Sequence, residues 1–211
     1  DASRALSRQL SYWSDRLKDL PDQLDLPIDR PRPAVASHRG AAIAVSLSGD
    51  LHGGLLKLAK ESGSSLFMVL QAGLAALLSR LGCGSDIAIG SPIAGRTDVA
   101  LDDLVGFFVN TLVLRTDTSG NPSFRDLLLR VRSDDLAAYG HQDVPFERLV
   151  EVLNPSRSLS RHPLFQVMLA FQNNAAVGLG LDGVAGRHEA VATSTSKFDL
   201  ALSLGELRQA D

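Results

Sequence analysis

The sequence contains one cysteine in 211 residues, Cys83. A single cysteine excludes an internal disulfide and a metal site built from several thiolates, and we interpret Cys83 as a small buried hydrophobe rather than a reactive thiol. No basic and then apolar leader opens the chain. The longest apolar run, at 66–78, is shorter than the roughly 20 residues that a membrane span requires. These absences predict a cytoplasmic protein without a membrane partner.

The sequence also lacks a large surplus of either charge. It has 21 Lys and Arg against 24 Asp and Glu, a net charge of −3, and no basic run. This balance argues against nucleic acid and against an anionic membrane surface as partners. Aromatic residues are sparse, at 5%, so we expect a core of Leu, Ala and Val within one large domain or two small ones.

Local catalytic motifs are missing as well. No histidine is adjacent to another or is followed four residues later by a carboxylate, which excludes the H-E-x-x-H zinc motif and the H-x-x-x-D acyltransferase motif. Neither a G-x-S-x-G elbow nor a phosphate-binding G-x-x-x-x-G-K-[ST] loop is present. The glycine-rich stretch 177–186 does not join a predicted strand to a helix, so we interpret it as a flexible or hairpin-forming segment rather than a dinucleotide site. We predict no metal and no resident cofactor.

Periodicity divides the chain into three parts. Apolar residues at spacings of three and four predict an amphipathic helix over 3–20, which Pro21 ends. Its apolar face is expected to dock on the domain itself in preference to a partner. The stretch 21–37 holds four prolines and has no helical period, so it predicts an extended surface connector. The rest of the chain alternates predicted strands and helices.

This alternation predicts an α/β fold, with a mixed β-sheet and helices long enough to cover one of its faces. The expected strands lie at 41–48, 85–93, 107–117, 165–173 and 198–204. The expected helices lie at 50–60, 65–81, 122–139 and 144–153, the first of them capped by Asp50. Two long irregular segments remain, at 94–106 and at 174–196, the second with at most one short strand near 183–191. Such segments are often functional.

The stretch GHQDVPFERL at 140–149 allows a catalytic and a structural interpretation. His141 and Asp143 are a possible general base and its orienting carboxylate, but no nucleophile accompanies them, and side chains two residues apart in a turn point in different directions. Alternatively, Asp143 caps a helix that has Pro145 in its first turn and Glu147 near its positive end. The local residues favour the structural interpretation.

Three stretches together resemble a known family. VGFFVNTLVLR at 105–115, HQDVPFE at 141–147 and RSLSRHPL at 157–164 are similar, in this order, to the last three core motifs of condensation domains of nonribosomal peptide synthetases. SPIAGR at 91–96 and SKFDLALSL at 196–204 also resemble family segments. The residues that match the three motifs are Gly106, Phe108, Val109, Asn110, Thr111, Arg115, all of 141–147, Arg157, Ser160, Arg161, Pro163 and Leu164. Ser158 stands where the family commonly has aspartate.

The resemblance implies a chloramphenicol acetyltransferase-like fold, in which two α/β lobes form a V with the active site in the tunnel between them. The family's catalytic signature, two adjacent histidines, three residues and then Asp-Gly, is absent here. The chain therefore resembles the C-terminal subdomain alone. By this resemblance 1–20 is a leading helix, 21–40 a connector and 41–211 one α/β lobe. The catalytic histidine is expected upstream of Asp1, and the family's final strand and helix beyond Asp211.

The resemblance also implies which segments and residues face the tunnel. A floor loop within 91–110 and a latch within 172–200 would cross the cleft, and no catalytic residue is expected in this chain. The candidate tunnel or motif residues are Arg96, Gly106, Phe108, Asn110, Thr111, Arg115, His141, Gln142, Asp143, Arg157, Ser160 and Arg161.

Structural roles are the alternative for several of these residues. Asn110 would be a strand amide in a sheet hydrogen bond, and Arg115 would close the end of its strand. Arg157 and Arg161 would fix the 154–164 loop by pairing with carboxylates, with Asp143 or Glu147 as partners. Of the alternating pair 107–108, one phenylalanine is expected in the core and the other toward the tunnel.

Three functions follow from the resemblance. The first is half of an enzyme that forms amide bonds between carrier-protein-bound thioesters, inactive as this chain alone. Its partners would be the N-terminal half of the domain, peptidyl carrier proteins that present substrates on phosphopantetheine, and the adenylation domain. The second is a non-catalytic binding module that recruits a carrier protein or a tailoring enzyme. The third, a freestanding coenzyme A acyltransferase, is disfavoured by the missing H-x-x-x-D motif. Epimerization domains share the fold but usually depart from the VNT sequence seen here, so they are ranked below condensation domains.

Overall fold

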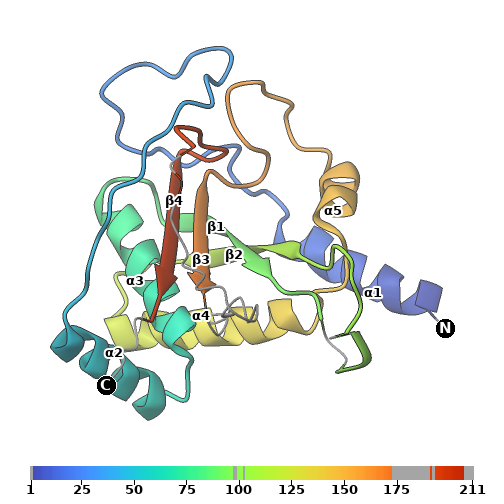
Figure 1. Cartoon of the computed structure of the whole chain (residues 1–211). Coiled ribbons are helices and arrows are strands. Elements are labelled where there is room, and N and C mark those ends of the chain that lie inside the picture. The colour runs from blue at the N-terminus through green and yellow to red at the C-terminus, as the bar shows by residue number, and fades with distance from the viewer. Residues whose placement is uncertain (1, 97–98, 102, 173–190, 192, 207–211) are drawn as a thin grey trace, which may run out of the picture.

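A four-stranded mixed sheet forms the centre of the described part of the molecule (Figure 1). The computed structural model describes residues 2–96, 99–101, 103–172, 191 and 193–206. The strands are β1 (Asp86–Ile93), β2 (Asn110–Asp117), β3 (Val167–Gln172) and β4 (Leu200–Gly205). Their order is β2-β1-β3-β4, with β1 antiparallel to β2 and the other two pairings parallel. The expected mixed α/β sheet is confirmed.

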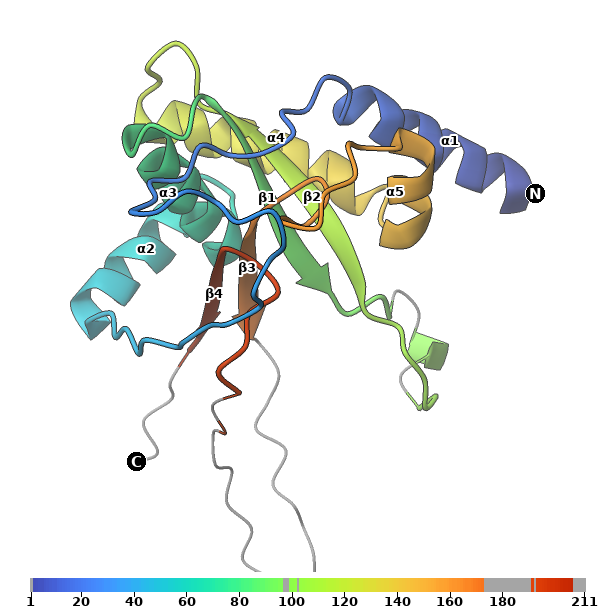
Figure 2. The same cartoon turned by 90° about the horizontal axis from the view of Figure 1, so that it is seen from above.

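Five helices flank this sheet among the described residues (Figure 2). They are α1 (Ala2–Arg16), α2 (Gly49–Glu61), α3 (Leu66–Arg80), α4 (Phe124–Tyr139) and α5 (Phe146–Leu153), and a 3-10 turn, η1, spans Val99–Leu101. The α2 cap is Ser48 and not the predicted Asp50, because Ser48 is still extended and its side chain accepts the Leu51 N–H, whereas Asp50 already lies in the first turn.

The two faces of the sheet are covered by different helices. Ile87 and Ile89 of β1 are fully buried in a cluster with Leu74 and Leu78 of α3. The alternate residue of the strand, Ala88, belongs to a cluster with Trp13 near the end of α1, Leu149 of α5 and Phe165. Helices therefore cover one face of the sheet, as expected. The sequence did not predict that α1 and α5 also pack against the other face.

Cys83 lies in the α3 cluster and is 5% exposed, as its interpretation as a buried hydrophobe predicts. Burial raises the pKa of its thiol, with the nearby charge of Asp25 adding to the effect. The thiol is thus held in its unreactive protonated form.

The predicted strand at 41–48 is wrong. This segment has no strand partner among the described residues, and its apolar side chains Ile43 and Val45 are 87% and 75% exposed. Alternation gives a segment the preference for a strand, but a strand forms only where a neighbouring strand pairs with its backbone. The connector before it contains no helix and no named strand, and it bends at several points. All but the last residue of the possible strand near 183–191 lies outside the described residues, as does most of the expected latch at 172–200.

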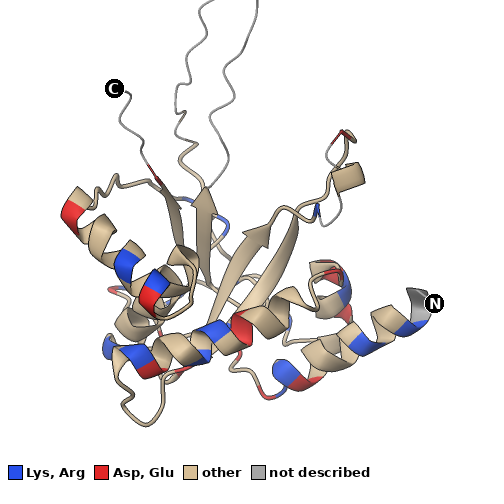
Figure 3. Ribbon diagram, turned by 90° about the horizontal axis from the view of Figure 1, so that it is seen from below, with Lys and Arg blue, Asp and Glu red and all other residues tan. Residues whose placement is uncertain are grey.

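Basic and acidic residues are interspersed along the α4 ribbon, and both signs also occur in α1 (Figure 3). Among the described residues, no single helix is long and apolar enough to cross a membrane. Only α2 and α3 taken together reach that length and composition, and they are bent by 105° relative to each other.

Candidate functional site

Asn110, the first residue of β2, joins two of the sequence motifs. Its amide nitrogen donates to the carbonyls of Gln142 (2.9 Å) and Val144 (2.8 Å), and its amide oxygen accepts the N–H groups of Thr111 (2.8 Å) and Phe146 (3.0 Å). These four bonds use both donors and both acceptor lone pairs of the side chain. Asn110 therefore positions the 140–146 turn, and its amide has no further hydrogen bond to offer a substrate.

Helix α5 begins differently from the prediction. Its N-cap is Pro145, whose side chain cannot accept a hydrogen bond from the first turn. Asn110 of β2 supplies an acceptor instead, because its amide oxygen accepts the Phe146 N–H. Asp143, the predicted cap, instead pairs with Gln9 of α1. Its carboxylate accepts from Gln9 Nε2 at 2.6 Å and its N–H donates to Gln9 Oε1 at 3.0 Å. The carboxylate is used to dock α1 on the turn.

His141 makes structural contacts through its ring face, its Nδ1 atom and its backbone carbonyl. Its ring lies 4.0 Å from the Tyr12 ring and nearly parallel to it, and its carbonyl accepts the indole N–H of Trp13 at 2.7 Å. Nδ1 lies 2.7 Å from the Ala137 carbonyl, which can only accept, so Nδ1 carries a proton. His141 and Asp143 thus bind different partners and form no base–carboxylate pair.

Arg115 closes the far end of β2, as the structural alternative predicts. Its guanidinium makes a two-bond pair with Asp86 of β1, with Nε–Oδ1 at 2.8 Å and Nη2–Oδ2 at 2.6 Å. Nη1 donates to the carbonyls of Arg16 and Lys18, where α1 ends and has carbonyls without helical partners. The hydrogen bonds that Arg115 donates to the Asp86 carboxylate raise the pKa of Arg115, so its charge is permanent.

The predicted partners of Arg161 are wrong. Its side chain contacts Asp22 of the connector, through the Asp22 carbonyl at 3.0 Å and the carboxylate at 3.5 Å, and neither Asp143 nor Glu147. The reason is that the connector crosses the 154–164 loop, which no local pattern reveals. None of the ion pairs among the described residues involves Arg157.

The loop of the third motif holds itself together through hydroxyls. Ser158, at the position where the family commonly has aspartate, accepts the Ser160 N–H at 3.1 Å and bonds the Ser160 hydroxyl at 2.8 Å. The Ser160 carbonyl in turn accepts from Arg32 of the connector at 3.0 Å. A short hydroxyl therefore makes the local turn contact that an aspartate would make.

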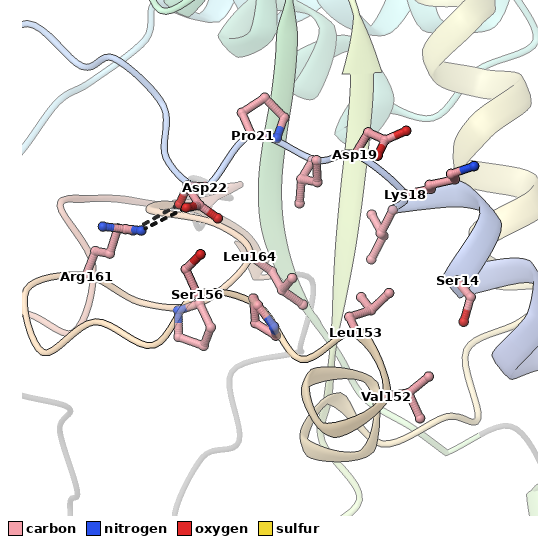
Figure 4. A pocket seen from close by; sticks show the side chains of 14 residues that line it. Ser14, Lys18, Asp19, Pro21, Asp22, Val152, Leu153, Ser156, Arg161 and Leu164 are labelled. Atoms are coloured by element: carbon pink, nitrogen blue, oxygen red, sulfur yellow. Dashed lines mark hydrogen bonds and ion pairs between the residues drawn. The ribbon is translucent and has the colours of Figure 1, made fainter.

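Two adjoining grooves border this loop. One, of about 370 Å³, lies between the end of α1, the connector and α5, and its lining includes Lys18, Val152 and Arg161 (Figure 4). The other, of about 540 Å³, includes Arg157 and Leu159. Neither lining contains a histidine or a cysteine, and the described residues hold no group of three or more His, Cys, Asp or Glu side chains suited to a metal.

The segment between β1 and β2 extends beyond the sheet and exposes apolar side chains (Figure 2). Val105 and Phe107 are fully or almost fully exposed, at 104% and 91%. Phe108 is half-buried beneath the Arg96 guanidinium, 4.2 Å from the ring centre, and Arg96 also donates to the Leu101 and Leu104 carbonyls. The alternation of Phe107 and Phe108 is as predicted, but Phe108 packs under an arginine and not in the core.

Two glycines shape this segment. Gly95 has φ +68°, and a side chain there would collide with the Phe108 carbonyl at 1.8 Å, so only glycine fits. A Cβ on Gly106 would lie 3.0 Å from the Phe108 ring. The segment is therefore folded around Phe108, while Phe107 points away from it.

The comparisons with known proteins agree with these motifs. The family model described as "Condensation domain" matches residues 1–210. The chain is 57% identical, over its full length, to a dimodular nonribosomal peptide synthase of Bacillus subtilis, and 48% identical over 98% of its length to an isonitrile lipopeptide synthase of Mycobacterium tuberculosis. It spans 9% and 8% of the lengths of these relatives.

Solved structures show the same fold. The X-domain in its complex with OxyB from teicoplanin biosynthesis superposes with a TM-score of 0.88 at 32% identity, over 97% of this chain and 44% of that chain. A four-domain nonribosomal peptide synthetase bound to AMP and glycine gives a TM-score of 0.87 at 27% identity, over 95% of this chain and 16% of that one. The chain belongs to the condensation-domain family.

Proposed function

We propose that residues 1–211 are the C-terminal subdomain of a condensation domain that joins carrier-protein-bound aminoacyl or peptidyl thioesters through an amide bond. The observation that carries the proposal is that the family model matches residues 1–210, while the chain spans only 44–46% of the X-domain chains. The family's adjacent histidine pair is absent from the sequence. The reacting centre is therefore expected in the other half of the domain.

In this reaction the amine of the acceptor attacks the thioester carbonyl of the donor. The C–N bond forms, the C–S bond breaks, the amine loses a proton, and the phosphopantetheine thiol of the donor carrier protein leaves. Phosphopantetheine is thus part of the substrate and not a cofactor of this chain. The subdomain's own contribution is one wall of the tunnel and surfaces for the other half, the carrier proteins and the adenylation domain.

The exposed side chains of the β1–β2 segment support the role of a floor loop. Val105 and Phe107 have no packing in this chain, and apolar groups of that exposure are typical of contact surfaces. At the two ends of the segment, Arg96 fixes Phe108 and Asn110 fixes the 140–146 turn. These contacts hold the segment in place, and we propose that Phe107 contacts the second lobe.

The unpaired edge of β4 supports the proposal that this sheet belongs to a larger domain. Only β3 pairs with β4 among the described residues, and residues on either side of the unpaired segment 41–48 contact residues that precede and follow β4. Gly40 N–H donates to the Ser194 carbonyl at 3.0 Å, and His52 lies 2.8 Å from the Glu206 carboxylate. We infer that the other part of the proposed larger domain covers this edge.

The direct test is an amide-forming assay with loaded carrier proteins. The purified chain 1–211 is expected to give no dipeptidyl product, and the complete domain is expected to give one. The matched control is the complete domain with alanine in place of the upstream signature histidines. Product from chain 1–211 alone would contradict the proposal.

A non-catalytic binding module is the second candidate. The observation that favours it is the likeness to an X-domain solved in complex with OxyB. In that case the complete domain would give no product although it folds, and it would bind a tailoring enzyme or a carrier protein. Sequencing upstream of Asp1 separates the candidates, because an intact signature supports the enzyme and a degraded one supports recruitment.

A further inference from the structure

Asp135 is a buried carboxyl group at the junction of α4, α3 and β2. It is 1% exposed, as are Gln71 of α3 and Thr116 of β2. The Gln71 amide nitrogen donates to Asp135 Oδ1 at 3.0 Å and lies 3.4 Å from the Thr116 hydroxyl. The side-chain amide of Gln71 thus links all three elements through the interior of the protein.

Two oxygen atoms of this cluster have no hydrogen-bond donor. They are Asp135 Oδ2 and the single amide oxygen of Gln71, Oε1, and the two groups already share one hydrogen bond through the Gln71 amide nitrogen. An ionised carboxylate and an amide oxygen are both acceptors, so neither can satisfy the other. Buried polar atoms without a partner are costly and uncommon in folded proteins.

The charged surroundings of Asp135 do not compensate an ionised form. The nearby cation, Arg16 of α1, pairs with the neighbouring Asp134 at 2.6 Å. On its own helix Asp135 faces the negative charge of Asp134 and the phenol of Tyr139, and α1 adds the phenol of Tyr12. The contacts from α3 and β2 are the uncharged Gln71 and Thr116. Burial, with a smaller contribution from Asp134, raises the pKa of Asp135 to about 7, against the lowering effects of the Gln71 bond and Arg16.

We propose that Asp135 is a neutral carboxylic acid in the folded protein and that its Oδ2 proton is donated to Gln71 Oε1. One proton then satisfies both of the unpartnered oxygens and makes the pair reciprocal, with the amide and the acid each donating once. When the proton is lost to solvent, the carboxylate keeps a single donor and Gln71 Oε1 has none. The pair is therefore a pH-sensitive contact between α3 and α4 that is weakened when Asp135 ionises, beneath the strand that carries Asn110 and Arg115.

The sign of the pH dependence follows from the direction of the shift. The folded protein holds the proton more tightly than the unfolded chain, in which the carboxyl has its ordinary value of 3.8. The stabilisation is present in acid and is lost as the pH rises to about 7. The shift from 3.8 to about 7 corresponds to a loss on the order of a thousandfold in the folding equilibrium constant.

Asp135→Asn tests the contact because an amide supplies the same donor and the same acceptor at every pH. Urea unfolding of the wild type and the variant between about pH 5 and pH 8 measures the difference. We expect the wild type to lose stability toward pH 8 while the variant does not, so that the variant is the more stable protein above neutrality. Asp134→Asn is the control, since that carboxylate is paired with Arg16 and partly exposed. Parallel curves for wild type and Asp135→Asn would overturn the proposal.

Infrared spectroscopy of the wild-type protein gives an answer even if the variant fails to fold. With ¹³C-labelled aspartate, a protonated carboxyl band is expected at about pH 6, where ordinary aspartates are ionised, and it is expected to disappear as the pH passes about 7. Absence of this band at about pH 6 would show an ionised Asp135, with a water molecule donating to the two oxygens, and would overturn the proposal. Neither experiment depends on amide-forming activity.

Discussion

The motif VGFFVNTLVLR divides between two regions of opposite character. Its second half, from Asn110 to Arg115, lies in the sheet, and the polar side chains at its two ends are fully engaged with the backbone or with Asp86. Its first half lies in the projecting segment, where Val105 and Phe107 have almost no packing in this chain. Residues next to each other in one motif therefore serve different purposes, and only the exposed half is available to a partner.

Asn110→Ala should cause the largest effect on the engaged region. It removes four hydrogen bonds and leaves the carbonyls of Gln142 and Val144 and the N–H of Phe146 without partners. We expect the free energy of unfolding to fall by about 2–4 kcal/mol, measured by urea denaturation. Asn110→Asp is the matched control, because it keeps the acceptor for Phe146 and loses both donors. Equal stability of wild type and Asn110→Ala would show that the turn does not depend on this side chain.

Arg115→Ala should have the next largest effect. It removes the paired bonds to Asp86 and the donors to the carbonyls that end α1. We expect a loss of about 1.5–3 kcal/mol, because hydrogen bonds between charged groups are stronger than neutral ones and the Arg115 side chain is only 19% exposed. Arg115→Lys keeps the charge but not the planar fork, so it should recover part of the loss. Full recovery by lysine would mean that charge alone is required.

Much of this fold follows from patterns that are local in the sequence. Helix α3 and strand β1 were predicted to within a residue, because the apolar runs that define them are local in the sequence and Ser65 directly precedes the helix as its N-cap. The partners of the motif residues were not predicted. Gln9 meets Asp143 across 134 positions and Asp22 meets Arg161 across 139, and a single sequence contains no signal for such pairings.

The wrong strand at 41–48 and the wrong cap at Asp143 have a common cause. In both cases the local residues favour the predicted structure, but a group distant in the sequence determines whether it forms. The strand lacks a partner among the described residues, and Asn110 supplies the cap from β2. The exposed position of Phe107 and the partly buried, hydrogen-bonded position of Asn110 also cannot be distinguished from the motif alone, because burial is a property of the assembled fold.

His141→Ala should have a smaller effect, and mainly on stability. The variant loses the stacked contact with Tyr12 and the bond to the Ala137 carbonyl, and we expect the free energy of unfolding to fall by about 1–2 kcal/mol. In the complete domain, turnover should change less than tenfold, because nothing places this ring at a reacting atom. Tyr12→Phe preserves the stack and is the control. A thousandfold loss of turnover in a normally folded variant would reinstate His141 as a catalytic base.

Phe107→Ser should have the smallest effect on chain 1–211. Phe107 is 91% exposed, so its removal should change the free energy of unfolding of this chain by less than about 0.5 kcal/mol. In the complete domain the proposed contact with the second lobe would bury the ring, and there we expect a loss of about 1.5–3 kcal/mol and slower amide formation. Phe108→Ser is the matched control, because its ring packs under Arg96 within this chain and its loss should be felt in both proteins. If Phe107→Ser were equally silent in the complete domain, the exposed half of the motif would not be a lobe contact, and the contrast with the engaged half would have to be explained by another partner.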